Sequence, residues 1–209
     1  MENSDYPVIE IRDVNSKKKL ICLGKESASF VLYNAELRKF GIKEGGSISS
    51  DTYLKIIELL KERARNRSLY IVTRKDITES QLRSRLKEDG YAEEIIDETV
   101  VFMKEHSFIN DVRYAGNYVW CKADVKSRRQ IETYLYGKGI SREIIESACD
   151  EYYASNEDAE EELIRKLIEK RRVDVRTMSY EEKSKLMAYL ARKGFGFDNI
   201  QYVIDEMKR

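Results

Sequence analysis

The sequence predicts a mainly α-helical protein, with three tandem three-helix repeats that form an elongated curved array behind a small antiparallel β meander. Three observations support this fold class. The 209 residues include one proline and ten glycines, too few for many short strands and tight turns. A Leu-x3-Gly-hydrophobic pattern occurs three times, beginning at Leu86, Leu135 and Leu190. The N-terminal segment 1–50, in contrast, contains apolar residues that alternate with the period of a β-strand.

The N-terminal segment is expected to form three strands and one short helix. The expected strands are Val8–Arg12, Leu20–Leu23 and Ser27–Leu32, separated by the polar runs 17–19 and 24–26. Asn34 is the expected N-cap of a helix that reaches Phe40, because its side chain can accept a hydrogen bond from a free N–H of the first turn. Gly41 and the pair at 45 and 46 then interrupt the chain.

Helical periodicity begins at Asp51 and continues to the C-terminus. One face of the first helix is expected to be apolar, through Tyr53, Leu54, Ile57, Leu60 and Ala64. The predicted divisions are a linking helix with repeat 1 at 51–103, repeat 2 at 104–153 and repeat 3 at 154–209. Each repeat is expected to open with a further helix, near 66–74, 111–123 and 157–172 respectively.

The repeats are defined by glycines 49 residues (90 to 139) and 55 residues (139 to 194) apart, a spacing typical of helical arrays. Leucines four residues apart share one helix face, and a glycine after them can end the helix in a left-handed conformation. Ser141 and Gly196 are suitable caps for the following helices, and Ala92 is a poorer one. A capping-box pattern precedes each glycine, at Thr78 with Gln81, Ser127 with Gln130, and Ser179 with Glu182.

Composition limits the classes of function. Lys+Arg and Asp+Glu are equal at 38 each, so no net charge draws the whole chain to nucleic acid or membrane. We expect no signal peptide and no membrane span, and a cytoplasmic location. Cys22, Cys121 and Cys149 are odd in number and widely spaced, which predicts reduced, buried thiols.

The sequence argues against an enzyme, a cofactor site or a metal site. His106 is the single histidine and lies at an expected break between helices, where a solvated or capping role is favoured. Three scattered cysteines have no zinc-ligand spacing. The glycines between 41 and 46 lack the Gly-Lys-Ser/Thr of a phosphate loop, which favours a plain turn. The acids of 157–162 are expected to complement a helix dipole.

Basic and acidic blocks alternate in the second half of the chain, which indicates either a docking surface for a charged partner or simply solvated helix faces. Aromatic residues lie among the bases, and core packing is favoured over base stacking for Tyr114, Tyr118 and Trp120. From charge alone, the candidate partner-binding residues are Arg113, Lys122, Lys126, Arg128, Arg129, Arg171 and Arg172.

Three segments resemble the RecX family of recombinase regulators. Phe108-Ile-Asn-Asp-Val-Arg-Tyr-Ala115 is similar to that family's Tyr-Ile-Asp-Asp-x-Arg-Phe-Ala segment. The segment 127–140 resembles its Arg-Ile-x3-Leu-x2-Lys-Gly-Ile signature, and 189–195 resembles its closing Tyr-Leu-x-Arg-Arg-Gly-Phe. The resemblance extends from about 66 to 205, and the β-containing N-terminal segment is similar to that of some Gram-positive members. Asn110 departs from the family pattern, which usually has an acid there.

The resemblance implies a non-enzymatic regulator of RecA, active in recombinational DNA repair and the SOS response. It implies binding in the groove of the RecA–single-stranded DNA filament, with inhibition of strand exchange and ATP hydrolysis. The expected partner is this filament, with weak direct DNA contact as a further expectation, no membrane partner, and a monomeric chain. Two alternatives remain: a direct single-stranded nucleic-acid-binding protein, and an unrelated protein-interaction scaffold.

Overall fold

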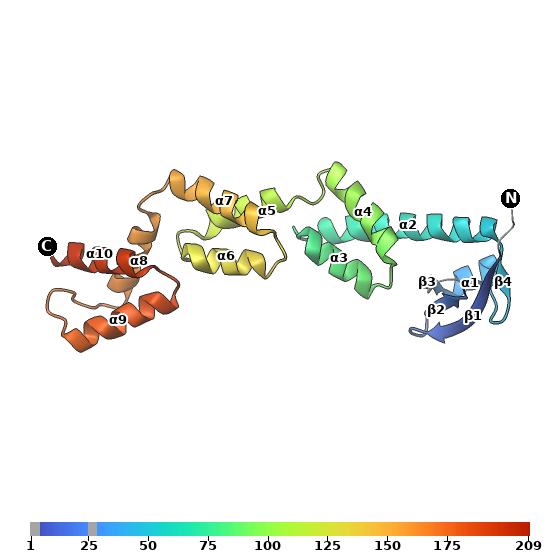
Figure 1. Ribbon diagram of the computed structural model, residues 1–209, viewed down its shortest axis with the longest axis horizontal. Helices are drawn as coiled ribbons and strands as arrows, with labels where there is room; N and C mark the ends of the chain where they lie inside the picture. The colour runs from blue at the N-terminus through green and yellow to red at the C-terminus, as the bar shows by residue number, and fades with distance from the viewer. Residues whose placement is uncertain (1–4, 25–28) are drawn as a thin grey trace. The chain divides into compact units, whose positions relative to one another are not determined.

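The computed structural model describes residues 5–24 and 29–209, and the chain divides into two compact units, Met1–Ile109 and Asn110–Arg209. The first unit holds a sheet, one short helix and three longer helices, and the second unit holds six helices (Figure 1). The predicted mainly helical fold with an N-terminal antiparallel sheet is confirmed. Within the described residues, no helix is both long and apolar enough to cross a bilayer.

The sheet has four antiparallel strands in the order β3-β2-β1-β4. The strands are β1 (Tyr6–Asp13), β2 (Lys18–Leu23), β3 (Ser29–Tyr33) and β4 (Ser47–Ile48). The three predicted strands are confirmed, although residues 25–28, which include the expected start of the third, lie outside the described residues. The two-residue β4 was not predicted, because so short a segment carries no periodicity.

Helix α1 (Asn34–Phe40) begins one residue earlier than expected. Tyr33 is the N-cap, and its backbone N–H donates to Glu36 Oε2 at 2.7 Å. The prediction of Asn34 as the cap is therefore wrong: its side-chain nitrogen instead donates to the Ser16 carbonyl in the loop between β1 and β2. Gly41 ends the helix with φ 64°, as the turn predicted there requires.

Helix α2 (Ser50–Val72) is a single helix of 23 residues, so the separate helix expected near 66–74 does not exist. The residues around 66 include no proline or glycine, and nothing in the backbone interrupts the hydrogen-bond ladder there. The buried face is formed by Ile56, Leu60, Ala64, Ser68 and Ile71. Leu54, expected on that face, is 62% exposed, because it is rotated away from the stripe that Leu60 and Ala64 define.

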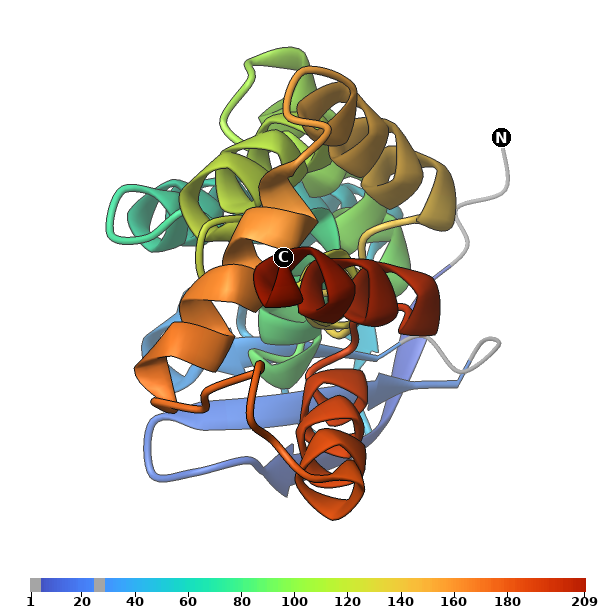
Figure 2. The same ribbon diagram turned by 90° about the vertical axis from the view of Figure 1, so that its left-hand side faces the viewer.

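Three helix triplets follow the sheet. The first is α2, α3 (Glu79–Glu88) and α4 (Glu93–Glu105); the second is α5 (Asp111–Lys122), α6 (Arg128–Tyr136) and α7 (Arg142–Ala154); the third is α8 (Ala159–Lys170), α9 (Tyr180–Arg192) and α10 (Phe197–Lys208). Figure 2 looks at the third triplet, where α10 lies across α8 and α9. All three predicted capping boxes are present, at the starts of α3, α6 and α9.

The turn glycines have the predicted left-handed backbone, with φ 89° at Gly90, 77° at Gly139 and 96° at Gly194. In each turn the residue after the glycine donates its N–H to the carbonyl five residues earlier. The three bonds join Tyr91 to Leu86 at 3.1 Å, Ile140 to Leu135 at 3.3 Å, and Phe195 to Leu190 at 3.3 Å. This is the Schellman arrangement, which satisfies carbonyls that the helix end leaves free. The next helices are capped by Ala92, Ser141 and Gly196, as predicted.

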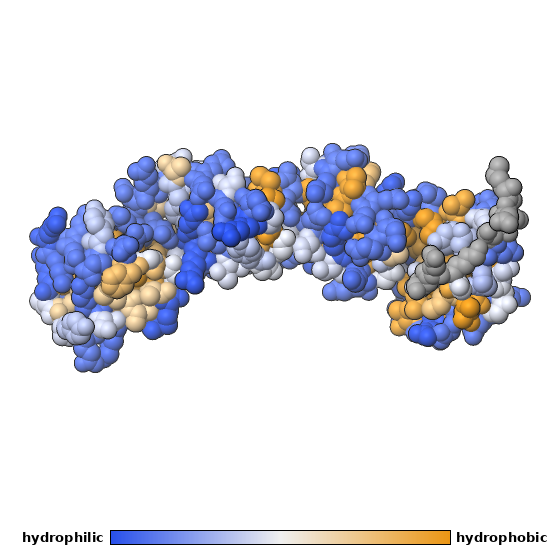
Figure 3. Space-filling model, viewed as in Figure 1, coloured by the Kyte–Doolittle hydropathy of each residue, from blue (hydrophilic) through white to orange (hydrophobic). Residues whose placement is uncertain are grey.

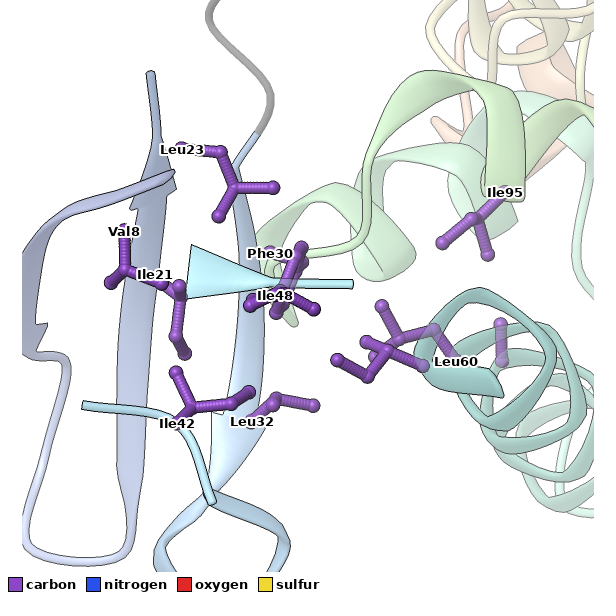
Figure 4. Packing of buried hydrophobic residues seen from close by; sticks show 11 residues of the cluster. Val8, Ile21, Leu23, Phe30, Leu32, Ile42, Ile48, Leu60 and Ile95 are labelled. Atoms are coloured by element: carbon purple, nitrogen blue, oxygen red, sulfur yellow. The ribbon is translucent and has the colours of Figure 1, made fainter. Parts of the chain in front are cut away.

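Among the described residues, the buried apolar side chains form two hydrophobic clusters in each unit. In the first unit, side chains of the sheet face Leu60 of α2 and Ile95 of α4 (Figure 4), and a second cluster lies among α2, α3 and α4. In the second unit, one cluster lies in the second triplet and one in the third. The cysteines are free but not uniformly buried, since Cys22 is half-buried and Cys121 exposed, which corrects the prediction. Cys149 is buried, and burial raises the pKa of its thiol to about 11.

Candidate functional site

The seven predicted partner-binding residues all lie in the second unit, at helix ends rather than along one helix face. Arg113 is exposed in the first turn of α5, and Lys122 is half-buried at its end. The others are Lys126 in the loop before α6, Arg128 and Arg129 in the first turn of α6, and Arg171 and Arg172 directly after α8. Hydrophilic residues cover most of the face of this unit that Figure 3 shows.

Arg128 is occupied by contacts within the protein. Its Nε donates to Glu132 at 2.9 Å and its Nη2 to Asp150 of α7 at 2.7 Å. The guanidinium also lies 5.6 Å from the centre of the Tyr153 ring. Burial disfavours the charge, but the hydrogen bonds to the two carboxylates outweigh it and raise the pKa of Arg128. Arg128 therefore joins α6 to α7 and offers little charge to a partner.

Lys126 and Arg129 line a cleft between the start of α6 and the end of α9. The cleft has a volume of about 500 Å³. Its lining residues are Lys126, Arg129, Gln130, Thr133, Tyr134, Ala191, Arg192, Lys193 and Gly194. Arg192 and Lys193 were not among the predicted residues, because they are more than sixty positions from Lys126 in the sequence. Their position as a basic pair immediately before the glycine of the third repeat could have indicated them as candidates.

A close contact between α6 and the turn after α9 forms the cleft. The Ser127 hydroxyl donates to the Lys193 carbonyl at 2.7 Å and accepts from the Gln130 N–H at 3.3 Å. A Cβ on Gly194 would lie 2.7 Å from the Ser127 hydroxyl oxygen and 3.1 Å from Arg129 Cβ. Only glycine permits this approach, so the turn glycine has a packing role here in addition to its backbone conformation.

The four cations of the cleft lack the ion pairs that several other bases of the unit form. Elsewhere, Arg142 pairs with Glu146 at 2.6 Å and Lys166 with Glu162 at 3.7 Å. Among the residues that the structure describes, no ion pair joins a carboxylate to Lys126, Arg129, Arg192 or Lys193. The cleft therefore retains uncompensated positive charge.

The basic surface extends from the cleft to Arg171. The Arg171 guanidinium lies 3.9 Å from the centre of the Tyr189 ring, and Lys193 Nζ lies 5.8 Å from it. Arg171 and Arg172 also line a second hollow, whose lining includes the acids Asp174 and Glu182 as well as Lys185. Arg172 has φ 54°, a conformation that costs a non-glycine residue about 1 kcal/mol.

The aromatic residues among these bases mostly pack inward. Tyr118 and Tyr134 stack with ring centres 4.1 Å apart, and Tyr114 packs against the same cluster. Core packing is thus confirmed for Tyr114 and Tyr118. It is wrong for Trp120, which is 59% exposed, with its ring nearly perpendicular to that of Tyr152 and the ring centres 5.0 Å apart.

The features set aside as enzyme or metal sites have structural roles. His106 is exposed at the C-cap of α4, with Nδ1 2.9 Å from the Phe102 carbonyl oxygen. The Gly45 N–H donates to Val8 O in a turn against β1. Glu160, Glu161 and Glu162 lie in the first turn of α8, as dipole complementation predicts. No group of three His, Cys, Asp or Glu side chains that could hold a metal occurs among the described residues.

Comparison with known proteins identifies the family. Models of the RecX first and third three-helix domains match residues 64–103 and 158–204. The chain is 35% identical over 167 residues to Regulatory protein RecX of Caldanaerobacter subterraneus, covering 79% of this chain and 81% of that protein. It is 30% identical over 206 residues to Regulatory protein RecX of Clostridium botulinum, covering 95% and 93%.

Two crystal structures share the fold. One of a regulatory protein RecX has a TM-score of 0.64 at 23% identity and covers 96% of this chain and 99% of its own. That of RecX from Lactobacillus salivarius has a TM-score of 0.60 at 24% identity and covers 71% of this chain and 96% of its own. The similarity in sequence, the two domain models and the shared fold agree: this chain belongs to the RecX family of regulatory proteins, which are not enzymes.

Proposed function

We propose that this chain regulates the RecA recombinase by binding the RecA–single-stranded DNA filament in the cytoplasm. The binding inhibits ATP hydrolysis and strand exchange, and so modulates recombinational repair and the SOS response. Membership of the RecX family over nearly the whole chain is the observation that carries the proposal. No cofactor or membrane takes part, and the chain acts as a monomer.

The basic surface of the second unit supports binding to a polyanionic assembly. Its charges are Lys126, Arg129, Arg171, Arg192 and Lys193, and Arg113 and Lys122, at the two ends of α5, are further candidates. These residues come from two successive helix triplets, so a single chain offers more than one point of contact. Several weak contacts with a repeating filament combine into a strong one, because each contact after the first is intramolecular.

A RecA ATPase titration tests the proposal. RecA is assembled on single-stranded DNA, and the full-length protein is added at substoichiometric amounts. A lower steady-state rate of ATP hydrolysis is expected, because one bound chain contacts several protomers. An unchanged rate across the titration would reject RecA regulation, and capture of a different protein without any effect on RecA would favour the scaffold alternative.

A matched pair of variants tests the surface. Lys126→Gln with Arg192→Gln removes two unpaired charges of the cleft, whereas Arg142→Gln with Lys166→Gln removes two charges from exposed ion pairs. Inhibition of the ATPase should weaken with the first pair and remain with the second. Equal losses would show that only net charge matters.

A further inference from the structure

The cleft between α6 and α9 concentrates four positive charges that no ion pair among the described residues neutralises. Arg192 and Lys193 lie at the end of α9, where they complement the helix dipole. Lys126 and Arg129 lie at the start of α6, where the dipole opposes them. Helix α6 has no acid in its own first turn, and the Glu160 carboxylate of α8 instead accepts from the Arg128 N–H there at 3.0 Å. Glu160 offsets the dipole of α6, but among the described residues it forms no ion pair with Lys126 or Arg129, so the charges of these two side chains remain uncompensated.

The chemistry of the lining selects the class of anion. Four cations converge on a concave surface that contains no carboxylate, and a concave site of one sign concentrates the potential. The lining offers little apolar surface to a protein partner, since Ala191 is the only aliphatic side chain. Protein interfaces depend on buried aromatic and aliphatic side chains, whereas interfaces with nucleic acid are polar and strongly positive. The balance favours a polynucleotide over an acidic protein segment.

The one aromatic ring of the cleft is not available to bases. Tyr134 stacks against Tyr118 on one side, and Lys138 Nζ lies 5.0 Å from its ring centre. Base stacking requires a free ring face, so the cleft can contact the backbone of a strand but cannot hold its bases in this way. Contacts to phosphates position a nucleic acid without distinguishing its sequence.

We propose that this cleft binds phosphate groups of a polynucleotide backbone through Lys126, Arg129, Arg192 and Lys193, without sequence preference. For its biological setting the inference rests on the proposed function, in which the cleft would contact the DNA of the filament. The binding itself requires no RecA. It therefore gives the second unit a nucleic-acid contact that is separate from any contact with RecA protomers.

The test uses the full-length protein and a fluorescein-labelled dT oligonucleotide in an anisotropy titration without RecA. Binding is expected at low salt, and the logarithm of the association constant should fall with the logarithm of salt concentration with a slope near −3, which is about −0.7 for each of four phosphates. A mixed-sequence oligonucleotide should bind within about twofold of dT, because phosphates carry no base identity. The same titration with a labelled DNA duplex shows whether the cleft prefers a single-stranded or a double-stranded backbone.

The matched variants assign the binding to the cleft. Lys126→Gln with Arg192→Gln should lower the affinity and reduce the magnitude of the salt slope by about 1.4, the contribution of two phosphates. Arg142→Gln with Lys166→Gln removes the same net charge from ion pairs outside the cleft and should leave the slope unchanged. Circular dichroism and thermal melting establish that both variants are folded.

Three results would overturn the inference: no binding of wild-type protein at low salt, equal losses in the two variants, or binding of polyglutamate as tight as that of dT. Each is distinguishable from failure of the proposed function. Inhibition of the RecA ATPase without binding of free oligonucleotide would remove the phosphate site and leave RecA regulation in place. Oligonucleotide binding without any effect on the ATPase would support the phosphate site and reject RecA regulation.

Discussion

Gly90 and Gly116 show, at the scale of single residues, that glycines of this chain have different importance. Gly90 has φ 89°, and a Cβ there would lie 2.7 Å from Val31 Cγ2 of the sheet. Gly116 lies inside α5, where a Cβ would meet nothing within 4 Å. Position 90 requires glycine both for its positive φ and for its close approach to Val31. Nothing in the structure requires glycine at position 116.

This contrast predicts opposite effects of the same substitution. Gly90→Ala should lower the free energy of unfolding by at least about 1–2 kcal/mol, the cost of a left-handed alanine before its clash with Val31. Gly116→Ala should raise it by about 0.5–1 kcal/mol through helix propensity. Urea unfolding of both variants measures the difference. A stabilised Gly90→Ala protein would contradict the packing of the sheet against this turn.

The leucine four residues before each turn glycine is buried in its triplet, and Leu135 is fully buried. Leu135→Ala should therefore cost about 2–5 kcal/mol, the range for a leucine truncated in a closed core. Leu54, which is 62% exposed, is the matched control and should change by less than about 0.5 kcal/mol. Equal effects in chemical denaturation would show that the two helix faces had been misassigned.

At the scale of elements, the capping serines are alike in sequence but not in structure. Ser179 caps α9 at an exposed position. Ser127 caps α6, is 1% exposed, and also donates to the Lys193 carbonyl of the next triplet. One hydroxyl thus ends one helix and begins another, which joins the second triplet to the third.

Substitution of the two serines tests this joint. Ser179→Ala should cost about 1 kcal/mol, the usual value of an N-cap. Ser127→Ala should cost about 2–3 kcal/mol, because the Lys193 carbonyl also loses its donor. Equilibrium unfolding in urea compares them, and similar values would mean that the hydrogen bond between triplets contributes nothing.

Glu79 makes the packing of α3 on α4 sensitive to pH. Burial of its carboxylate is opposed by hydrogen bonds from Lys104 at 2.9 Å and Arg83 at 2.8 Å, and the net effect lowers the pKa of Glu79. A carboxyl whose pKa is lower in the folded than in the unfolded state stabilises the fold above its unfolded-state pKa. That stabilisation is lost as pH falls through the lower, folded-state value.

The Glu79→Gln variant isolates this contribution. It should be about 1 kcal/mol less stable than wild type near neutral pH, since the pair is partly exposed. The difference should shrink below the ordinary carboxyl pKa of 4.5 and vanish in stronger acid. Unfolding free energies of the two proteins across this pH range provide the measurement. A difference that stays constant into acid would contradict the ionic origin.

At the scale of the whole molecule, each compact unit has its own hydrophobic clusters, so each has what an independent fold requires. Fragments 1–109 and 110–209 should both be helical by circular dichroism and melt cooperatively. The second fragment should keep the oligonucleotide affinity of the full chain. Gradual, non-cooperative melting of either fragment would show that its unit depends on the other.

Apart from the family resemblance, local sequence patterns specified the three glycine turns and the three capping boxes, but not the N-cap of α1 or the continuity of α2. These turns and capping boxes depend on residues within about five positions of one another, where hydrogen bonds and backbone conformation follow directly from residue type. The first three strands were predicted for the same reason, whereas the two-residue β4 was too short to predict.

Which charges are available to a partner depends on contacts between residues that lie far apart in the sequence. Arg128 and Arg129 are neighbours in sequence, yet the first pairs with Asp150 of α7 and the second faces a cleft completed by Arg192 and Lys193. The exposure of apolar side chains also depends on the tertiary structure, since Leu54 of α2 and Trp120 of α5 were expected to be buried and are exposed. Ion pairing and burial depend on atoms that the fold brings together from distant positions in the sequence. Local sequence patterns therefore cannot predict them.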